Sequence, residues 1–226
     1  MRLVRMKSFL GLMIALFFSG MTTVYGAELS VVDRSVELGD YRMELIREYA
    51  QLHYGNEEVY IQPQAIVLHW TASSSSEGVY AYFFSAETEN SFYRKQGRLN
   101  VSAQFLVERD GTIFRLTPET LLNRHAIGIN WCAIGIENVG GVDGKEDLTE
   151  EQVQANRKLI IYLKEKYPEI TYLLGHYQLK YMRDTALWKE YSQGYQTGKT
   201  DPGPRFMKEV IEAIKPLELL TFPLEN

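Results

Sequence analysis

Cysteine is almost absent from this sequence, in which Cys132 is the single one among 226 residues. A lone cysteine excludes an intrachain disulfide, so the fold has to depend on its apolar core rather than on covalent cross-links. Cys132 lies in the apolar stretch NWCAIGIE. A buried, unreactive thiol is a simpler interpretation there than a catalytic nucleophile.

Low-complexity segments and internal repeats are also missing. Apolar residues make up 45% of the chain and charged residues 23%, which is the composition of a globular protein with a substantial core. The length fits one domain, or at most two small ones. The formal net charge of −5 argues against nucleic acid as a partner, because a protein binds the phosphate backbone with an excess of basic residues.

Residues 1–26 differ from the rest of the chain: a basic start precedes the apolar run FLGLMIALFF and then small or polar residues. This order predicts a signal peptide cleaved before Ala27. An uncleaved membrane anchor is the alternative, but the run is shorter than the roughly 20 apolar residues of a spanning helix. Cleavage would remove three basic and no acidic residues, which changes the net charge from −5 to −8. We therefore expect an exported protein, periplasmic or extracellular, without stable membrane insertion.

Strand and helix patterns alternate along the remainder of the chain. The runs AIVLHW, AIGIENVGG and TYLLGH predict buried strands, and the first and last of these carry a histidine at or next to their end. AQFLVERDGTIFRL predicts a β-hairpin, joined by Asp110-Gly111, a dipeptide of the tight primed turns. TASSSSEG predicts a loop. These elements predict a single α/β domain over residues 63–226, with a mixed β-sheet flanked by helices.

Three helices are predicted around these strands. The clearest is LTEEQVQANRKLIIYLKEKYP, where Thr149 and Gln152 form a capping box and Pro168 ends the helix. A closing helix follows Asp201, with Phe206, Val210 and Ile214 on its apolar face. An N-terminal helical extension is predicted within residues 27–62, with Asp40 as its cap and an apolar face at helical spacing. That face comprises Tyr41, Leu45, Tyr49 and Leu52.

Two histidines and one aspartate occupy positions where α/β proteins assemble functional sites. His69 and His176 each lie at the end of a predicted buried strand, and Asp201 lies in the stiff loop TDPGP before the closing helix. Two imidazoles and one carboxylate are a common ligand set of catalytic zinc, with the fourth position left for water. A single histidine is more often a core or surface residue, as we expect for His53. Spacing alone therefore leaves the metal site and the structural interpretation both open.

Six segments occur in the order seen in the type 2 family of N-acetylmuramoyl-L-alanine amidases, which are related to the peptidoglycan recognition proteins. The sequence resembles these zinc-dependent enzymes from about Pro63 to Phe206. The segments are IVLHWTAS, VSAQFLVERDGTIFRL, NRHAIGIN, AIGIENVGG, LLGHYQ and KTDPGPRF.

The resemblance implies a ligand set and two catalytic side chains. It places the family's zinc ligands at His69, His176 and Asp201, with one zinc ion per chain. Glu137, the acid of IGIE, and Lys199, two residues before the metal acid, would be the catalytic residues. The implied activity is hydrolysis of the bond between N-acetylmuramic acid and L-alanine in peptidoglycan or muropeptides. The implied residues also suit the chemistry, since a carboxyl can shuttle a proton and an ammonium can balance negative charge.

The resemblance further implies a substrate-binding set near the metal. His125, from the segment that corresponds to the family's HAG pattern, would lie beside the substrate rather than on the metal. Thr71 and Asn130 would contribute to the same surface.

One departure from the family pattern concerns the insert, residues 177–198, which lies between His176 and Asp201. The family usually leaves about ten positions between these ligands. The insert could form a flap over the cleft or an exposed embellishment, and we favour the second. Two other functions are weighed against the enzyme: a catalytically inactive peptidoglycan-binding module, and a zinc-stabilised structural domain. Neither of these would need Glu137 or Lys199.

Overall fold

Six strands form one mixed β-sheet in the computed structural model, which describes residues 29–225. The predicted signal peptide therefore lies outside the described residues. The strand order is β1-β4-β3-β5-β2-β6, and all neighbours run parallel except β3 and β4. This confirms the predicted mixed sheet. The strands are β1 Val31–Asp33, β2 Ala65–Trp70, β3 Phe105–Val107, β4 Ile113–Arg115, β5 Ala133–Asn138 and β6 Tyr172–Gly175.

β2 lies in the middle of the parallel part of the sheet, between β5 and β6. All six of its residues are buried, which is why the sequence reads as a continuous apolar run instead of an alternating one. Its side chains alternate between two cores: Ile66 and Leu68 point into one, and Ala65 and Val67 into the other. His69, two residues beyond Val67, therefore lies on the same face of β2 as Ala65 and Val67.

β3 and β4 form the predicted hairpin, but its turn differs from the prediction. Val107 pairs with Ile113, and the amide of Gly111 donates to the carbonyl of Glu108 at 3.0 Å. Gly111 has a φ of +84° and Asp110 is not among the residues with positive φ. This is a three-residue loop with glycine in the left-handed position, so the predicted primed turn is wrong.

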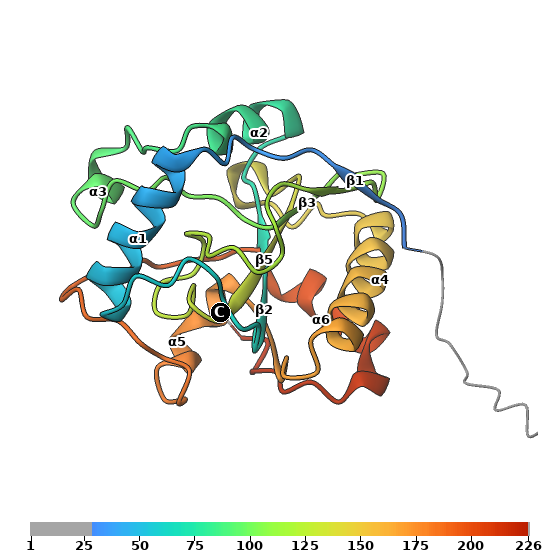
Figure 1. The fold of residues 1–226 in the computed structure, drawn as a ribbon. Coiled ribbons are helices and arrows are strands. Elements are labelled where there is room, and N and C mark those ends of the chain that lie inside the picture. The colour runs from blue at the N-terminus through green and yellow to red at the C-terminus, as the bar shows by residue number, and fades with distance from the viewer. Residues whose placement is uncertain (1–28, 226) are drawn as a thin grey trace, which may run out of the picture.

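Within residues 29–225, six α-helices surround the sheet (Figure 1). α4 and α6 pack against each other on one side of it, and α1 lies on the opposite side. Among residues 29–225, no helix combines the length and the apolar character needed to cross a membrane. The helices are α1 Asp40–Tyr54, α2 Ser76–Phe84, α3 Ser91–Arg94, α4 Glu150–Lys166, α5 Leu179–Met182 and α6 Pro204–Ala213.

The predicted N-terminal cap is correct for α4 but not for α1. The capping box of Thr149 and Gln152 is present at the start of α4, as predicted. At α1 the cap is Gly39, which makes no side-chain bond, and Asp40 is the first helical residue. The predicted cap at Asp40 is therefore wrong, although a carboxylate in the first turn still interacts favourably with the helix dipole.

α1 joins the main core through a face that is shifted from the predicted one. Its buried stripe includes Leu45 and Tyr49, but Tyr41 and Leu52 are 46% and 44% exposed. Adjacent positions, Ile46 and Ala50, are buried in their place. The apolar face of α6 agrees with the prediction. Phe206, Val210 and Ile214 are all buried.

α2 begins inside the stretch that was predicted as a loop. Ser75 caps it, because its hydroxyl accepts from the amide of Gly78 at 3.3 Å. Its C-terminal end is held by Arg42 of α1, whose guanidinium donates to the carbonyls of Phe83 and Phe84 at 2.9 Å. The N-terminal helix thereby fixes the position of α2. The patterns predicted neither α2, α3, α5 nor β1.

Candidate metal centre and cleft

Parallel pairing brings His69 and His176 together. Leu68 of β2 pairs with Gly175, the last residue of β6, so the residue that follows each of them is a histidine at the same edge of the sheet. His176 begins a short 3-10 turn, and the amide of Tyr177 in that turn donates to the carbonyl of Asp201 at 2.9 Å. This backbone bond holds the third residue beside the two histidines despite the long insert.

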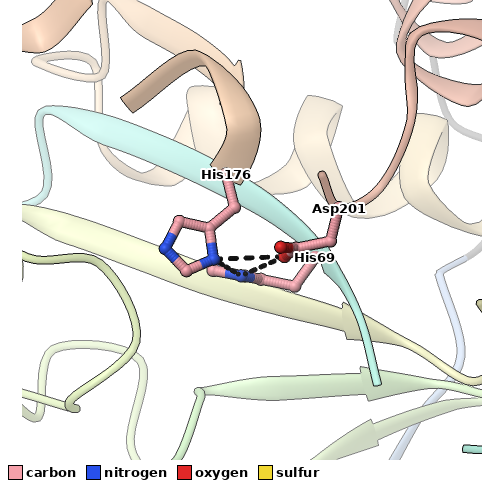
Figure 2. Close-up of side chains that lie close together, drawn as sticks. All are labelled: His69, His176 and Asp201. Carbon is pink, nitrogen blue, oxygen red and sulfur yellow. Dashed lines mark hydrogen bonds and ion pairs between the residues drawn. The ribbon is translucent and has the colours of Figure 1, made fainter. Parts of the chain in front are cut away.

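Three ligand atoms converge at this edge (Figure 2). Nδ1 of His69 lies 3.0 Å from Nδ1 of His176, and Oδ2 of Asp201 lies 3.1 Å from each of these nitrogens. Side chains that bind zinc at 2.0–2.1 Å in a tetrahedron place their ligand atoms about 3.3 Å apart. The observed spacing and the His-His-Asp donor set both fit such an ion.

The protonation states of His69 and Asp201 also suit metal binding. Burial and the neighbouring His176 lower the pKa of His69 to about 4. Burial alone would raise the pKa of Asp201, but the two histidines outweigh it and hold that pKa well below its usual range. At neutral pH the imidazole of His69 is therefore neutral and the carboxylate ionised, which are the forms that bind a metal ion.

A chain of hydrogen bonds fixes the tautomer of His69. Nε2 of His125 lies 3.1 Å from the carbonyl oxygen of Ala133, and since a carbonyl only accepts, this nitrogen carries the proton. Nδ1 of the neutral His125 is then an acceptor, 3.1 Å from Nε2 of His69. His69 therefore donates through Nε2 and keeps Nδ1 unprotonated, facing Asp201.

The fold makes room for the His125 ring. A side chain at Gly135 would place its Cβ 2.8–3.0 Å from ring atoms of His125, so glycine is needed there in the middle of β5. The loop that carries His125 is tied down by Asn130, whose Oδ1 accepts from the amides of His125 and Ala126 at 2.9 and 2.6 Å. Asn130 is fully buried, and its Nδ2 donates to the hydroxyl of Tyr49 at 3.1 Å.

Glu137 lies next to the three ligand atoms. It pairs with His69 across β5 and β2, and paired residues on neighbouring strands face the same side of a sheet. Within the described residues its buried Oε2 has no hydrogen-bond partner. Burial, with a smaller effect of Asp201, raises its pKa well above the usual range, and Lys199 opposes this shift. A carboxyl whose pKa is raised in this way holds a proton more readily than an exposed carboxyl does.

Lys199 and Thr71 line the same cleft as Glu137. Lys199 is half-buried and lies two residues before Asp201. The hydroxyl of Thr71 is engaged with its own loop, because it exchanges hydrogen bonds with the backbone of Ser73 at 3.1 and 3.2 Å. Lys199 thus places its ammonium group in the same cleft as the carboxyl of Glu137.

The cleft has a volume of about 520 Å³, and the three ligand residues are part of its lining. Its other walls were not predicted from the sequence. α2 supplies an apolar wall, and the aromatic run VYAYFF was the signal that could have indicated it. Among the residues of these walls are Val79, Tyr82, Phe83, Tyr93, Arg124 and Tyr195.

The insert, residues 177–198, is packed into the molecule and also lines the cleft. Met182, Leu187 and Tyr195 are buried in a core cluster. Glu190 forms an ion pair at 2.7 Å with His53 of α1, the histidine that we expected to be structural. The expectation of an exposed embellishment is therefore wrong, because the apolar residues of the insert cover β2 and β6 instead of facing solvent.

Buried Arg124 connects the insert to the rest of the cleft. Its guanidinium donates to the hydroxyl of Tyr195 at 3.0 and 3.1 Å. It also donates to the carbonyls of Tyr93, Gly97 and Leu99. One side chain thus joins two loops and the insert.

Comparison with known proteins relates the chain to one protein family. Residues 60–204 match the family model described as N-acetylmuramoyl-L-alanine amidase. The endolysin of Enterobacteria phage T3 is 32% identical over 120 residues, which cover 51% of this chain and 76% of the phage protein. The endolysin of Escherichia phage T7 is 32% identical over 119 residues, covering 51% and 75%.

Among solved structures, the endolysin N-acetylmuramoyl-L-alanine amidase LysCS from Clostridium intestinale URNW is similar. The superposition has a TM-score of 0.50 and 20% sequence identity, and covers 82% of this chain and 95% of the other. This likeness supports the shared fold.

Proposed function

The chain belongs to the N-acetylmuramoyl-L-alanine amidase family, and on that basis we propose that it hydrolyses the amide bond between N-acetylmuramic acid and L-alanine in peptidoglycan or its fragments, using one zinc ion. The observation that carries the proposal is the convergence of His69, His176 and Asp201 within 3.1 Å, next to Glu137 and Lys199. A binding module would need a cleft but no proton shuttle.

His69 and His176 would hold the ion through Nδ1, and Asp201 through Oδ2. A bound zinc ion supplies Lewis acidity to an amide carbonyl and to an attacking water. The chain itself prepares this site, because the bond from His69 to His125 directs the lone pair of Nδ1 toward the ion. Hydrogen bonds of this kind orient a metal ligand and raise its basicity.

Glu137 would serve as the proton shuttle. Its carboxyl would accept a proton from the attacking water and pass it to the leaving amine, steps that typically contribute a factor of about 10²–10⁴ in rate. The raised pKa of Glu137 supports this role. Lys199 would balance the negative charge that develops on the carbonyl oxygen, and loss of one such preorganised donor costs about 3 kcal/mol.

The three residues expected to bind substrate have different roles in this proposal. His125 and Thr71 line the cleft, where His125 would orient His69 in addition to lying near the substrate. Asn130 is fully buried and would act through the loop that it anchors, since both ends of its amide are engaged.

Incubation of the purified protein with a defined muropeptide tests the proposal. We expect free stem peptide to be released, the release to stop when a chelator is added, and zinc to restore it. A peptidoglycan-binding module would bind the same fragment in a calorimeter and release no peptide even with zinc present. That result would favour the alternative function.

Export to the periplasm or the extracellular space fits a substrate in the cell wall, and we propose it together with cleavage before Ala27. Measuring the N-terminal sequence and the compartment of the expressed protein tests this part by itself.

A further inference from the structure

Three buried amide side chains form a hydrogen-bonded relay between α4 and the strands of the proposed site. Asn138 is the last residue of β5, and Gln152 and Asn156 lie on the buried face of α4. All three are fully buried, and their apolar neighbours on α4, Val153 and Ile160, belong to the main core. Burying an amide is unfavourable unless hydrogen bonds replace those to water. Apolar side chains would therefore fill this space at a lower cost.

The carbonyl groups along the relay fix its direction. Nδ2 of Asn138 donates to the carbonyl of His69 at 3.0 Å, since a carbonyl only accepts. Oδ1 of Asn138 then accepts from Nδ2 of Asn156 at 2.6 Å. The same nitrogen of Asn156 donates to the carbonyl of Gln152 at 2.8 Å. Two side chains thus connect α4 to the backbone of a proposed metal ligand.

Gln152 anchors the helical end of the relay. Its Nε2 donates to the carbonyls of Val107 and Val139 at 3.2 and 2.9 Å, and its Oε1 accepts from the amide of Thr149 at 2.9 Å. Val107 ends β3 and Val139 follows β5. The first turn of α4 is therefore bonded to the ends of both strands, which gives the relay a fixed base.

The relay reaches the two strand ends that carry His69 and Glu137. These two residues are paired, and β2 and β5 each end one residue later, at Trp70 and Asn138. Adjacent residues of a strand point to opposite faces, so Asn138 faces α4 while Glu137 lies on the same face as His69. The ends of elements open more readily than their centres, and the Asn138 side chain adds a bond between β5 and β2 at this point.

We propose that Asn138 and Asn156 are positioning residues for His69 and Glu137. By holding the ends of β2 and β5 to α4, the relay keeps the ligand atom of His69 and the carboxyl of Glu137 at a constant separation. The inference rests on the proposed function, which gives these two side chains their roles. The cleft lining, over the described part of the chain, includes neither asparagine, so both would act through the residues that they hold.

Replacing both asparagines by leucine separates positioning from stability. Leucine has the same branching without polar atoms, and removing both partners of a buried hydrogen bond together costs little stability. The variant Asn138→Leu/Asn156→Leu should therefore melt close to the wild type. Its zinc affinity, measured where the protein is fully folded, should fall at least about tenfold, as on the loss of an outer partner of a metal ligand. Its kcat should fall while KM stays within about twofold.

Hydrogen exchange of the full chain adds a readout that does not depend on catalysis. The amide of Thr71 donates to the carbonyl of Asn138 at 3.0 Å, so its exchange reports on the two strand ends. The amide of Val67, in the middle of β2, is the internal reference. In the double variant, exchange at Thr71 should rise severalfold relative to Val67.

Leu163→Ala is the matched control for lost stability. Leu163 is fully buried on α4, seven positions beyond Asn156, and its substitution opens a cavity that should lower the melting temperature more than the double variant does. Zinc affinity of this control should stay within about twofold of the wild type, as expected for distant sites. Asn156→Ala is measured as well, because it interrupts the relay without adding bulk, and it should also lower zinc affinity.

Wild-type zinc affinity in both relay variants would overturn the inference, because His69 would then keep its position without the relay. An equal loss in Leu163→Ala would overturn it too, since the effect would follow stability. Release of peptide from a muropeptide distinguishes the two proposals. If all forms release peptide and bind zinc like the wild type, the function stands and the relay fails. If the wild type binds zinc but releases no peptide, the function fails, and weaker zinc binding in the variants still supports the positioning of His69. Wild type that binds no zinc would refute both.

Discussion

Nε2 of His69 lies 3.1 Å from Nδ1 of His125, and this contact determines which nitrogen of His69 faces Asp201. The carbonyl oxygen of Ala133 can only accept a hydrogen bond, so His125 donates to it through Nε2 and accepts from His69 through Nδ1. A residue expected to touch the substrate thus also orients a proposed metal ligand.

Replacing His125 tests this positioning role. His125→Leu removes the acceptor for Nε2 of His69, and we expect zinc affinity to fall by about 10–100-fold, the usual effect of losing such a partner. His125→Asn keeps an acceptor near the position of Nδ1 and should retain most of the affinity. Competition with a chromophoric chelator measures both. Equal affinities for the two variants would refute the role, and complete loss of metal, as in His69→Ala, would make His125 a ligand.

Gly135→Ala, a substitution in β5, tests whether the position of the His125 ring matters. Its Cβ would lie 2.8 Å from the His125 ring, and forcing an extra group into a filled core typically costs about 1–3 kcal/mol. We expect a lower melting temperature and weaker zinc binding. Gly198→Ala is the control for stability, since its Cβ would meet no atom within 4 Å. An unchanged melting temperature in Gly135→Ala would show that the ring moves aside without cost.

Metal content tests the proposed ligand set. We expect one zinc per chain after supplementation, and Asp201→Ala should lose most of it because only two imidazoles remain. Removing the ion with a chelator should also lower the melting temperature, since an ion that binds only the folded state stabilises it. Elemental analysis and calorimetric scans measure the two effects. Wild-type protein without zinc after supplementation would refute the ligand assignment.

Glu137→Gln and Lys199→Met separate catalysis from binding. Both variants should keep zinc and still bind muropeptide. Turnover of Glu137→Gln should fall at least 10²–10⁴-fold, the range for general acid–base catalysis. Lys199→Met should lose much of its rate with little loss of fragment binding, because an oxyanion donor acts mainly in the transition state. If Glu137→Gln hydrolyses at the wild-type rate, another group is the base.

Cys132 should be unreactive in the folded protein. It is fully buried, and burial raises the pKa of its thiol to about 12, so at pH 8 only about one thiol in 10⁴ is ionised. A disulfide reagent such as DTNB should therefore detect one thiol per chain in guanidinium and none without it. Rapid modification of the native protein would contradict the burial of this residue.

Hydrophobic periodicity and helix-capping motifs correctly predicted those strands and helices whose structure depends mainly on local sequence. β2 and α4 are of this kind, because a continuous apolar run and a capping box are local patterns. The sequence also indicated His69, His176 and Asp201, and the register of β2 with β6 explains why two distant strand ends meet.

The remainder depends on contacts between distant segments. The partner of His69 could not be predicted, since the position of His125 is set by Gly135 and Asn130. The packing of the insert likewise depends on Arg124 and on the pairing of Glu190 with α1, which no local pattern reveals.

The distance along the chain between the residues of the proposed metal centre bears on when an ion could bind. His69 and Asp201 are 132 residues apart, and contacts of such long range are slow to form during folding. A ribosome-bound chain that has not yet released Asp201 offers an incoming ion only a pair of imidazoles. The proposed ligand set is complete only once Asp201 has been added to the chain, 25 residues from its last residue. Under the proposed function, the chain would therefore lack activity until its synthesis is nearly complete.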